Sequence, residues 1–423
     1  MVPSTRALAE HLNLSRGVVV EAYEQLVAEG YLSSHPGGST RVCARAAVEA
    51  APTPASPHDP IEPRINFWYG RPDVTEFPRQ VWLRSIRRVL NEASNERLAY
   101  LDKRGAPELR DALATYLNRV RGTAADPERM VVCSGFAQAV GLVTWALKAR
   151  GARRMAVEDP GQRDTHSYLE IVPVPVDEAG IDVAALARTN VDVVLVTPAH
   201  HFPTGAVLSA ERRSALVAWA KDRGALILED DYDAEYRYDR EPIGAIHGLA
   251  PDQVIYAGTA SKTLMPGLRL GWMILPADLV DPIATIKDTI DRGSPSLEQL
   301  SFADFLGRGE FDRHLRRMRP IYRARRDTLL RALREHLPEG RPVGASAGLH
   351  VVAWLPDGID EAALIERAAA VGVALTGVTP YYRIHRNGPG GLIFGYGMPT
   401  ESEIEEGIRL IARELDALRR AAA

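Results

Sequence analysis

From Ile65 onward the chain alternates between short apolar runs and longer stretches with helical spacing of apolar residues. Short apolar runs bounded by turn residues are typical of buried strands, and the stretches between them are long enough to be crossover helices. This alternation predicts an α/β fold with a doubly wound, mainly parallel sheet. The expected strands are Met130–Cys133, Met155–Glu158, Ile171–Val176, Val191–Thr197, Ala225–Glu229, Gln253–Ala257 and Leu270–Leu275. The expected helices include Ala106–Val120, Gln138–Ala149 and Ala210–Arg223.

The C-terminal part predicts a smaller α+β domain. One long, charged, amphipathic helical stretch is expected from Phe302 to His336. A mixture of strands and helices is expected in the segments Leu349–Leu355, Ile359–Val371 and Leu392–Tyr396, and a closing helix at Glu401–Arg420. We therefore predict a large domain over residues 65–315 and a small domain over 316–423, with residues 65–95 packing with the small domain.

Residues 1–43 follow a different pattern. Apolar residues have helical spacing over Thr5–Leu12 and Arg16–Glu29, and Ser15 between them is suited to cap the second helix. A strand, the turn Ser34–Ser39 and a return strand follow. The Ala- and Pro-rich residues 44–64 predict a linker.

Composition narrows the class of protein. The chain has 423 residues and a formal net charge of −4, so no global basic field attracts nucleic acid or an anionic membrane. Its two cysteines, Cys43 and Cys133, have no metal-ligand spacing, which predicts neither a disulfide framework nor a bound metal. No apolar run reaches the ~18 residues of a membrane span, and the N-terminus has no signal-peptide core. We expect a cytoplasmic protein without membrane contact.

The segment Tyr256–Trp272 concentrates candidate chemistry. A strand leads into a Gly-Thr-Ala-Ser turn before Lys262, and Arg269 follows seven residues after the lysine. Upstream, another strand ends in the acidic run Glu229–Asp233. A Schiff-base lysine, an acid for a protonated pyridine nitrogen and an arginine for a phosphate are the groups that hold pyridoxal 5′-phosphate (PLP). Burial near cationic groups would keep the lysine amine neutral and reactive. Charge alone leaves open which acid points inward.

These motifs together resemble the PLP-dependent fold type I proteins, the aspartate aminotransferase superfamily, from about Ile65 to the C-terminus. Within this region Thr197–Gly205 (Thr-Pro-Ala-His-His-Phe-Pro-Thr-Gly) and Glu229–Tyr236 (Glu-Asp-Asp-Tyr-Asp-Ala-Glu-Tyr) are similar to the aminotransferase-like domain of MocR/GabR-type regulators. Those regulators fuse a GntR-type winged helix-turn-helix to this domain, and residues 3–43 match the later part of that module. The resemblance implies a fold type I transferase-like domain, preceded by a partial winged helix-turn-helix over residues 1–43, with PLP as cofactor.

The resemblance also implies roles for single residues. Asp230 would pair with the pyridine nitrogen, and Tyr232 would donate to the ring oxygen O3′. The phosphate would be bound by backbone N–H groups of Gly135, Phe136 and Ala137 and by the side chains of Thr259, Ser261 and Arg269. Tyr100 matches a tyrosine that reaches the phosphate of the partner subunit, so the resemblance implies a homodimer.

Two positions near the expected ring depart from ordinary aminotransferases. Gln162 stands where a tyrosine usually stacks on the ring, and His166, Tyr168 and His201 are the alternatives for that contact. Phe202 stands where an asparagine usually bonds O3′. Phe202 is typical of MocR-type domains and favours the regulator branch.

No single residue stands out as the ligand for the carboxylate group of an effector or substrate. Ile393 stands where many aminotransferases have an arginine for this group. Arg383 and Arg386 lie close to Ile393 in the sequence. They are either carboxylate ligands or solvated loop residues. The sequence therefore predicts an amino acid or amine as effector or substrate without naming it.

In the winged helix-turn-helix, Arg16–Glu29 would be the recognition helix. Contacts with DNA are expected at Ser4, Arg6, Ser15, Arg16, Gly37, Gly38 and Thr40. Residues 1–50 contain four arginines, five glutamates and no lysine, a weak electrostatic footprint for DNA. The chain also begins after the first helix of the module. Three explanations remain open: a start upstream of Met1, an intact module on another chain, or a vestigial segment.

The leading hypothesis is a PLP-dependent transcriptional regulator that senses an amino compound, or PLP itself, through an internal aldimine with Lys262. The alternative is a PLP-dependent enzyme, an aminotransferase or another amino-acid carbanion chemistry, with Lys262 also acting as general base. A third hypothesis is a cofactor-free αβ scaffold, in which the lysine would be an ordinary loop residue.

Overall fold

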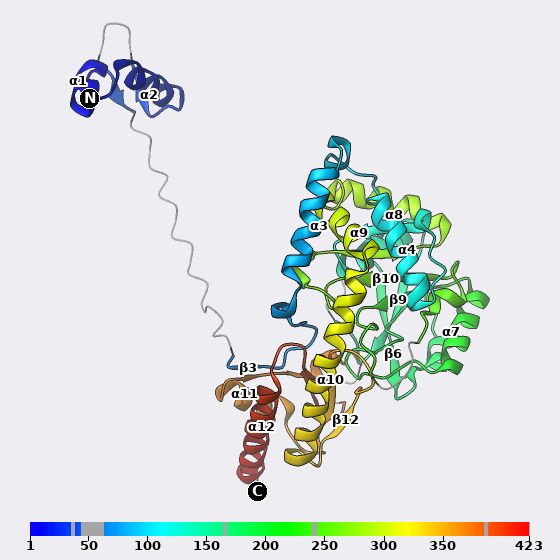
Figure 1. Cartoon of the computed structure of the whole chain (residues 1–423). Coiled ribbons are helices and arrows are strands. Elements are labelled where there is room, and N and C mark those ends of the chain that lie inside the picture. Colours follow the sequence, from blue (N-terminus) through cyan, green and yellow to red (C-terminus); the bar gives the residue numbers. More distant parts are fainter. Residues whose placement is uncertain (35–38, 44–62, 164–166, 239–242, 385–387, 423) are drawn as a thin grey trace. The chain divides into compact units, whose positions relative to one another are not determined.

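The computed structural model contains two compact units, residues 1–62 and residues 63–423 (Figure 1). It describes residues 1–34, 39–43, 63–163, 167–238, 243–384 and 388–422. Among these residues, no helix has both the length and the apolar character that crossing a membrane requires.

The N-terminal unit consists of two helices and a short hairpin. Its elements are α1 (Thr5–Leu12), α2 (Arg16–Ala28) and the antiparallel strands β1 (Leu32–Ser33) and β2 (Arg41–Val42). The Ser4 hydroxyl accepts from the Ala7 N–H at 3.2 Å, and the Ser15 hydroxyl accepts from the Val18 N–H at 3.4 Å. Both helices are thus capped, as predicted for Ser15. The small core is formed by Ala9, Val19, Tyr23 and Leu32.

An eight-stranded sheet forms the centre of the second unit. In sheet order its strands are β4 (Met130–Cys133), β11 (Gly271–Ile274), β10 (Val254–Thr259), β9 (Leu226–Asp231), β8 (Val193–Val196), β5 (Arg154–Asp159), β6 (Glu170–Asp177) and β7 (Gly180–Ile181). β11 is antiparallel to both neighbours and β7 to β6, whereas the other pairs are parallel. The predicted doubly wound, mainly parallel sheet is confirmed, and the predicted strand ends differ from these by at most two residues.

Helices cover both faces of this sheet, because alternate residues of a strand point to opposite faces. In β4, Val131 and Cys133 pack in the core shared with α5 (Phe136–Ala149) and α8 (Ala277–Asp291). Met130 and Val132 pack in the core of the other face. The helices on that other face include α4 (Pro107–Arg121), α6 (Val183–Ala187) and α7 (Ala210–Arg223).

A four-stranded antiparallel sheet organises the C-terminal part. Its order is β12 (Arg341–Val343), β13 (His350–Trp354), β16 (Gly391–Gly395) and β15 (Thr376–Gly377), packed with α11 (Glu361–Ala370) and α12 (Glu401–Ala422). The predicted smaller α+β arrangement is present. β3 (Ile65–Asn66) pairs in parallel with β14 (Val373–Ala374), and α3 (Arg79–Glu92) packs on α9 (Ser296–Gly307). Residues 65–92 therefore contact both parts of the unit.

The single helical stretch expected from Phe302 to His336 is interrupted. α9 ends at Gly307, and α10 (Glu310–His336) begins after Gly309, whose φ of +69° is left-handed. Glycine adopts this conformation without strain and ends the helix. The apolar spacing continues past the break because both helices face one core, which is why the sequence suggested one helix.

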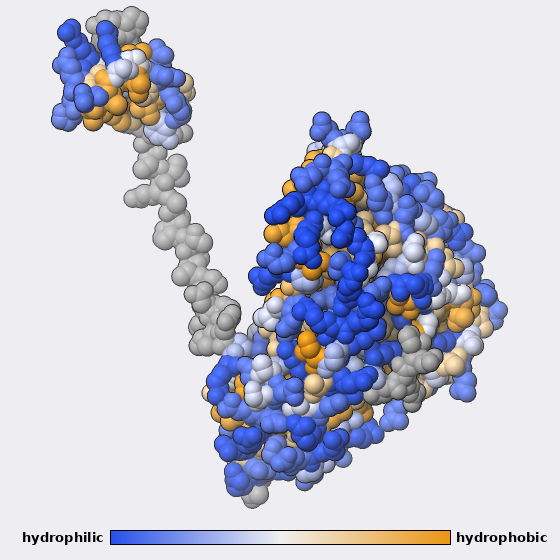
Figure 2. All heavy atoms as spheres, in the orientation of Figure 1, coloured by the Kyte–Doolittle hydropathy of each residue, from blue (hydrophilic) through white to orange (hydrophobic). Residues whose placement is uncertain are grey.

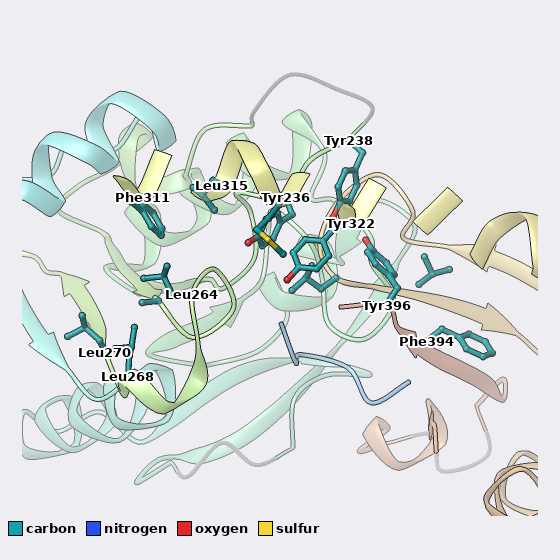
Figure 3. Close-up of a cluster of buried hydrophobic side chains, with 14 of the residues drawn as sticks. Tyr236, Tyr238, Leu264, Leu268, Leu270, Phe311, Leu315, Tyr322, Phe394 and Tyr396 are labelled. Carbon is teal, nitrogen blue, oxygen red and sulfur yellow. The ribbon is translucent and has the colours of Figure 1, made fainter. Parts of the chain in front are cut away.

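α10 runs along the buried cluster that Figure 3 shows. Its Tyr322 meets the ring of Tyr236 edge-on, with centroids 5.0 Å apart. The hydroxyls of Tyr238 and Tyr396 both donate to the backbone oxygen of Gly348, at 2.9 and 2.6 Å. The predicted domain boundary at 315–316 lies inside α10, which connects the two sheets without a break.

Candidate cofactor site and DNA-binding segment

Lys262 lies in the turn after β10, with its amine largely enclosed. Its Nζ donates to the backbone oxygen of Gly70 at 2.7 Å. Burial lowers the pKa of the Lys262 amine; Arg269 and Arg71 lower it further, while nearby carboxylates oppose them. A lowered pKa suits a Schiff-base lysine, since only the neutral amine attacks an aldehyde.

Three acidic side chains at or just after the end of β9 form polar contacts with other residues of the protein. Glu229 accepts from two backbone N–H groups at 2.8 and 2.9 Å. Asp231 accepts from the buried Arg121 guanidinium at 2.7 and 3.0 Å. Asp233 lies 3.0 Å from Nδ1 of His200. These side chains stabilise the fold and are not available to a ligand.

Asp230 differs from its neighbours because its carboxyl group forms no hydrogen bond with the residues that the structure describes. Its side chain is buried. Burial, with Asp231 and Asp233, raises the pKa of Asp230 well above its usual value, and Lys262 opposes this shift. A buried carboxyl group without a partner is costly unless a cationic N–H group pairs with it. The protonated nitrogen of a pyridine ring meets this requirement, so Asp230 fits its predicted role.

The residues predicted to bind the phosphate lie at the start of α5 and the end of β10. Gly135, with φ +114°, precedes the first helical N–H groups of α5. A Cβ added to Gly135 would lie 3.5 Å from Nη2 of Arg269, so the guanidinium faces this helix start. The hydroxyls of Thr259 and Ser261 lie 2.9 Å apart. Backbone N–H groups, hydroxyls and a guanidinium together suit a phosphate.

Asp230 lines a small pocket between this helix start and the loop after β8. The other lining residues are Phe136, Val157, Glu158, Gln162, Leu195, Thr197 and Phe202. Both departures from ordinary aminotransferases, Gln162 and Phe202, therefore lie at the pocket. Tyr168 instead packs against Trp145, with ring centroids 5.3 Å apart. His166 lies outside the described residues.

Tyr232 and His201 are held by hydrogen bonds within the protein. The Tyr232 hydroxyl donates to the backbone oxygen of His200 at 3.1 Å. Nδ1 of His201 lies 2.8 Å from the Thr204 hydroxyl, and its Nε2 lies 3.5 Å from Glu158. Burial, with His200, lowers the pKa of His201 to about 3. The His201 ring is therefore neutral near pH 7.

Tyr100, Ile393 and Arg383 do not line the pocket. Tyr100 is 88% exposed and lines no part of it. Ile393 is fully buried in the small sheet. Nη2 of Arg383 donates to the backbone oxygen of Gln162 at 3.1 Å. Arg386 lies outside the described residues.

Sequence reasoning missed a buried group formed by His200, Asp233 and His350, whose polar side-chain atoms lie within 4.8 Å of one another. The Nε2 atoms of His200 and His350 face the backbone oxygens of Gly344 and Pro203, at 3.3 and 2.9 Å. His350 belongs to β13, whereas the other two residues follow β8 and β9. The motifs contained His200 and Asp233, but only the fold brings His350 to them.

The DNA-binding prediction falls on the N-terminal unit. The predicted contacts within the described residues are Ser4, Arg6, Ser15, Arg16 and Thr40; Gly37 and Gly38 lie outside them. Arg16 is exposed at the first position of α2, and Arg6 pairs with Glu10 at 3.4 Å. The surface of this unit also carries exposed apolar side chains, among them Leu12 and Val18 (Figure 2).

Comparison with known proteins decides the family. The model of aminotransferase class I and II matches residues 65–386, and that of the bacterial regulatory proteins of the gntR family matches residues 1–42. YhdI, an uncharacterized HTH-type transcriptional regulator of Bacillus subtilis, is 33% identical over 96% of this chain and 89% of its own length. MocR, a probable rhizopine catabolism regulatory protein of Rhizobium meliloti, is 31% identical over 99% and 90%. The chain belongs to the MocR-type HTH transcriptional regulators.

The fold of the second unit is also that of solved aminotransferases. A kynurenine aminotransferase of Pyrococcus horikoshii, solved with PMP, matches with a TM-score of 0.76 and 26% identity, over 84% of this chain and 91% of that one. The predicted fold type I architecture and the MocR-type resemblance are thus confirmed. Members of this family of DNA-binding regulators combine an HTH segment with an aminotransferase-like domain.

Proposed function

We propose that this MocR-type chain is a PLP-dependent regulator that senses an amino compound, or PLP itself, at Lys262. The observation that carries the proposal is a largely enclosed lysine, whose amine donates to the Gly70 oxygen at 2.7 Å, close to the buried carboxyl group of Asp230, which has no hydrogen-bond partner among the described residues. The start of α5, whose first backbone N–H groups are suited to an anion, supports the phosphate part of the proposal. Burying a carboxyl group without a partner is costly, and a bound cationic N–H group would offset this cost.

The chain's own residues divide the binding task. When bound, PLP supplies an aldehyde that reacts with primary amines and an electron-withdrawing ring. Lys262 would hold the aldehyde carbon, and Asp230 would hold the protonated ring nitrogen. Tyr232 and His201 would lie near the ring. Tyr100 would be contributed by the other subunit of a homodimer. The phosphate would be bound by Gly135, Phe136, Ala137, Thr259, Ser261 and Arg269. The exposure of Tyr100 is compatible with a role in a partner subunit.

Regulation requires that a bound amino compound favours one arrangement of the protein over another. A candidate for the moving contact lies beside the pocket, where the small domain touches the loop after β5. The Gly161 N–H donates to the Tyr381 oxygen at 3.1 Å, and Asp159 accepts from the N–H groups of Arg383 and Ile384 at 2.6 and 3.1 Å. A ligand that altered this contact would shift the small domain.

The test uses the full chain reconstituted with PLP. We expect a visible absorbance band that borohydride reduction bleaches, because hydride converts the C=N bond to a stable C–N bond; mass spectrometry should then locate the attached cofactor on Lys262. Lys262→Ala should lose the band, whereas Lys103→Ala, at a lysine that instead pairs with Asp281 at 3.2 Å, should keep it. An equal band in Lys262→Ala would refute the proposal. Sustained conversion of an amino acid to its keto acid would instead favour the enzyme alternative.

A further inference from the structure

Arg71 lies next to the reactive lysine and has no ion-pair partner among the described residues. It directly follows Gly70, whose backbone oxygen accepts from Nζ of Lys262 at 2.7 Å. Its side chain is exposed, and the guanidinium lies over the Trp68 ring at 4.5 Å. The positive charge of Arg71 also contributes to the lowered pKa of the Lys262 amine. A solvent-exposed cation therefore lies close enough to the amine to act on its pKa.

The backbone that carries Arg71 is fixed against the end of β16. A Cβ on Gly395 would come within 2.5 Å of the Trp68 oxygen, and one on Gly397 within 2.2 Å of the Arg71 oxygen. The Gly395 N–H donates to the Phe67 oxygen at 2.8 Å. The backbone position of Arg71 is therefore set by the fold before any ligand binds, which lowers part of the entropic cost of binding.

The other arginines near the pocket are already engaged. The Arg269 guanidinium faces Gly135 at the predicted phosphate site. Arg383 donates to the backbone oxygen of Gln162, and Arg163 donates to that of Pro380 at 2.6 Å. These contacts hold two loops together. The Ile393 position offers only a buried apolar side chain.

We propose that Arg71 forms an anion subsite beside Lys262 and binds the carboxylate of an amino compound whose amine reaches the lysine's site. This inference rests on the proposed function and narrows its effector to amino carboxylates, in preference to simple amines. A planar guanidinium can donate two parallel hydrogen bonds to a carboxylate. The contact with the Trp68 ring restricts where the guanidinium can lie.

The experiment compares probes that differ only in the carboxylate: alanine against ethylamine, and 4-aminobutyrate against propylamine. Each is titrated into the PLP-loaded full chain, and the change in visible absorbance gives an apparent Kd. In the unsubstituted protein we expect the carboxylate to strengthen binding about tenfold to a hundredfold for at least one pair. Arg71→Gln should abolish that preference, which is a ratio of two affinities and so is read independently of any change in amine binding itself, whereas Arg71→Lys should keep part of it.

Three results would overturn the subsite. They are equal binding of both members of every pair by the unsubstituted protein, an undiminished preference in Arg71→Gln, and loss of the preference in Arg383→Gln instead. PLP affinity is measured in parallel, because a matching loss in Arg71→Gln would assign Arg71 to the cofactor. Absence of any Lys262-dependent absorbance would instead reject the proposed function, so the two failures are distinguishable.

Discussion

Substitution of two neighbouring aspartates by asparagine is predicted to affect different properties: Asp231→Asn should lower the free energy of unfolding, and Asp230→Asn should weaken PLP binding. Asp231→Asn removes the charge that pairs with Arg121, and both side chains are only 2% exposed. Asp231 also accepts from the Tyr256 hydroxyl at 2.6 Å. Removing one partner of a buried ion pair leaves the other charge uncompensated and costs about 3–5 kcal/mol. We expect Asp231→Asn to lose stability of this size.

Asp230→Asn should instead leave the fold intact and weaken cofactor binding. Its carboxyl group forms no hydrogen bond with the described residues, so the unliganded protein loses no partner and stability should change by less than about 1 kcal/mol. With PLP, the charge-assisted bond to the ring nitrogen is lost. Such bonds contribute about 1.5–3 kcal/mol, which corresponds to a PLP affinity roughly 10- to 150-fold weaker.

The assay pairs urea unfolding of the PLP-free proteins, followed by circular dichroism, with PLP titration followed by visible absorbance. Because Asp230→Asn and Asp231→Asn make the same chemical change, comparing them separates the effect of position from the effect of replacing a carboxylate with an amide. The reasoning is refuted if Asp230→Asn unfolds at markedly lower urea while Asp231→Asn does not. Unchanged PLP affinity in Asp230→Asn would refute the assignment of the ring-nitrogen partner.

Three further predictions address pH, the ring face and DNA. Burial lowers the pKa of His314 from 6.5 to about 4. Between these two values the unfolded chain binds a proton that the folded chain does not, so the free energy of unfolding falls by up to about 1.4 kcal/mol for each pH unit of acidification. His314→Gln should therefore make urea midpoints less sensitive to acid over this range. Gln162→Tyr should strengthen PLP binding by about 0.5–1.5 kcal/mol through ring stacking, and an unchanged titration curve would contradict it. Arg16→Ala should weaken DNA binding and reduce the slope of log affinity against log salt by about one, whereas Glu21→Ala on the same helix should not.

Much of the fold could be predicted because strand and helix periodicities are local. The strand and Gly-Thr-Ala-Ser turn before Lys262 and the acidic residues at the end of β9 can be recognised in the sequence for this reason. The break at Gly309 was not, since a glycine within an amphipathic pattern does not reveal its φ. Charge could not select Asp230 either, because its distinction is that Asp231 is paired with Arg121, 110 residues away in sequence.

The sequence also could not reveal groups that form only after packing. His350 joins Asp233 through the contact between the two sheets. Arg71 was not recognised, because its closeness to Lys262 depends on a contact between Gly70 and a turn 192 residues later. Tyr100 is exposed in the single chain, so its predicted role depends on a second subunit.

The central claim is that occupation of the Lys262 site changes DNA affinity. The most direct measurement is fluorescence anisotropy of the full chain with DNA from upstream of its own gene, alone, with PLP, and with PLP plus an amino compound that shifts the visible band. We predict saturable binding whose Kd changes about 5- to 150-fold between these states in the unsubstituted protein and stays constant in Lys262→Ala. A Kd that is the same in every state, or that changes equally in Lys262→Ala, would contradict the account.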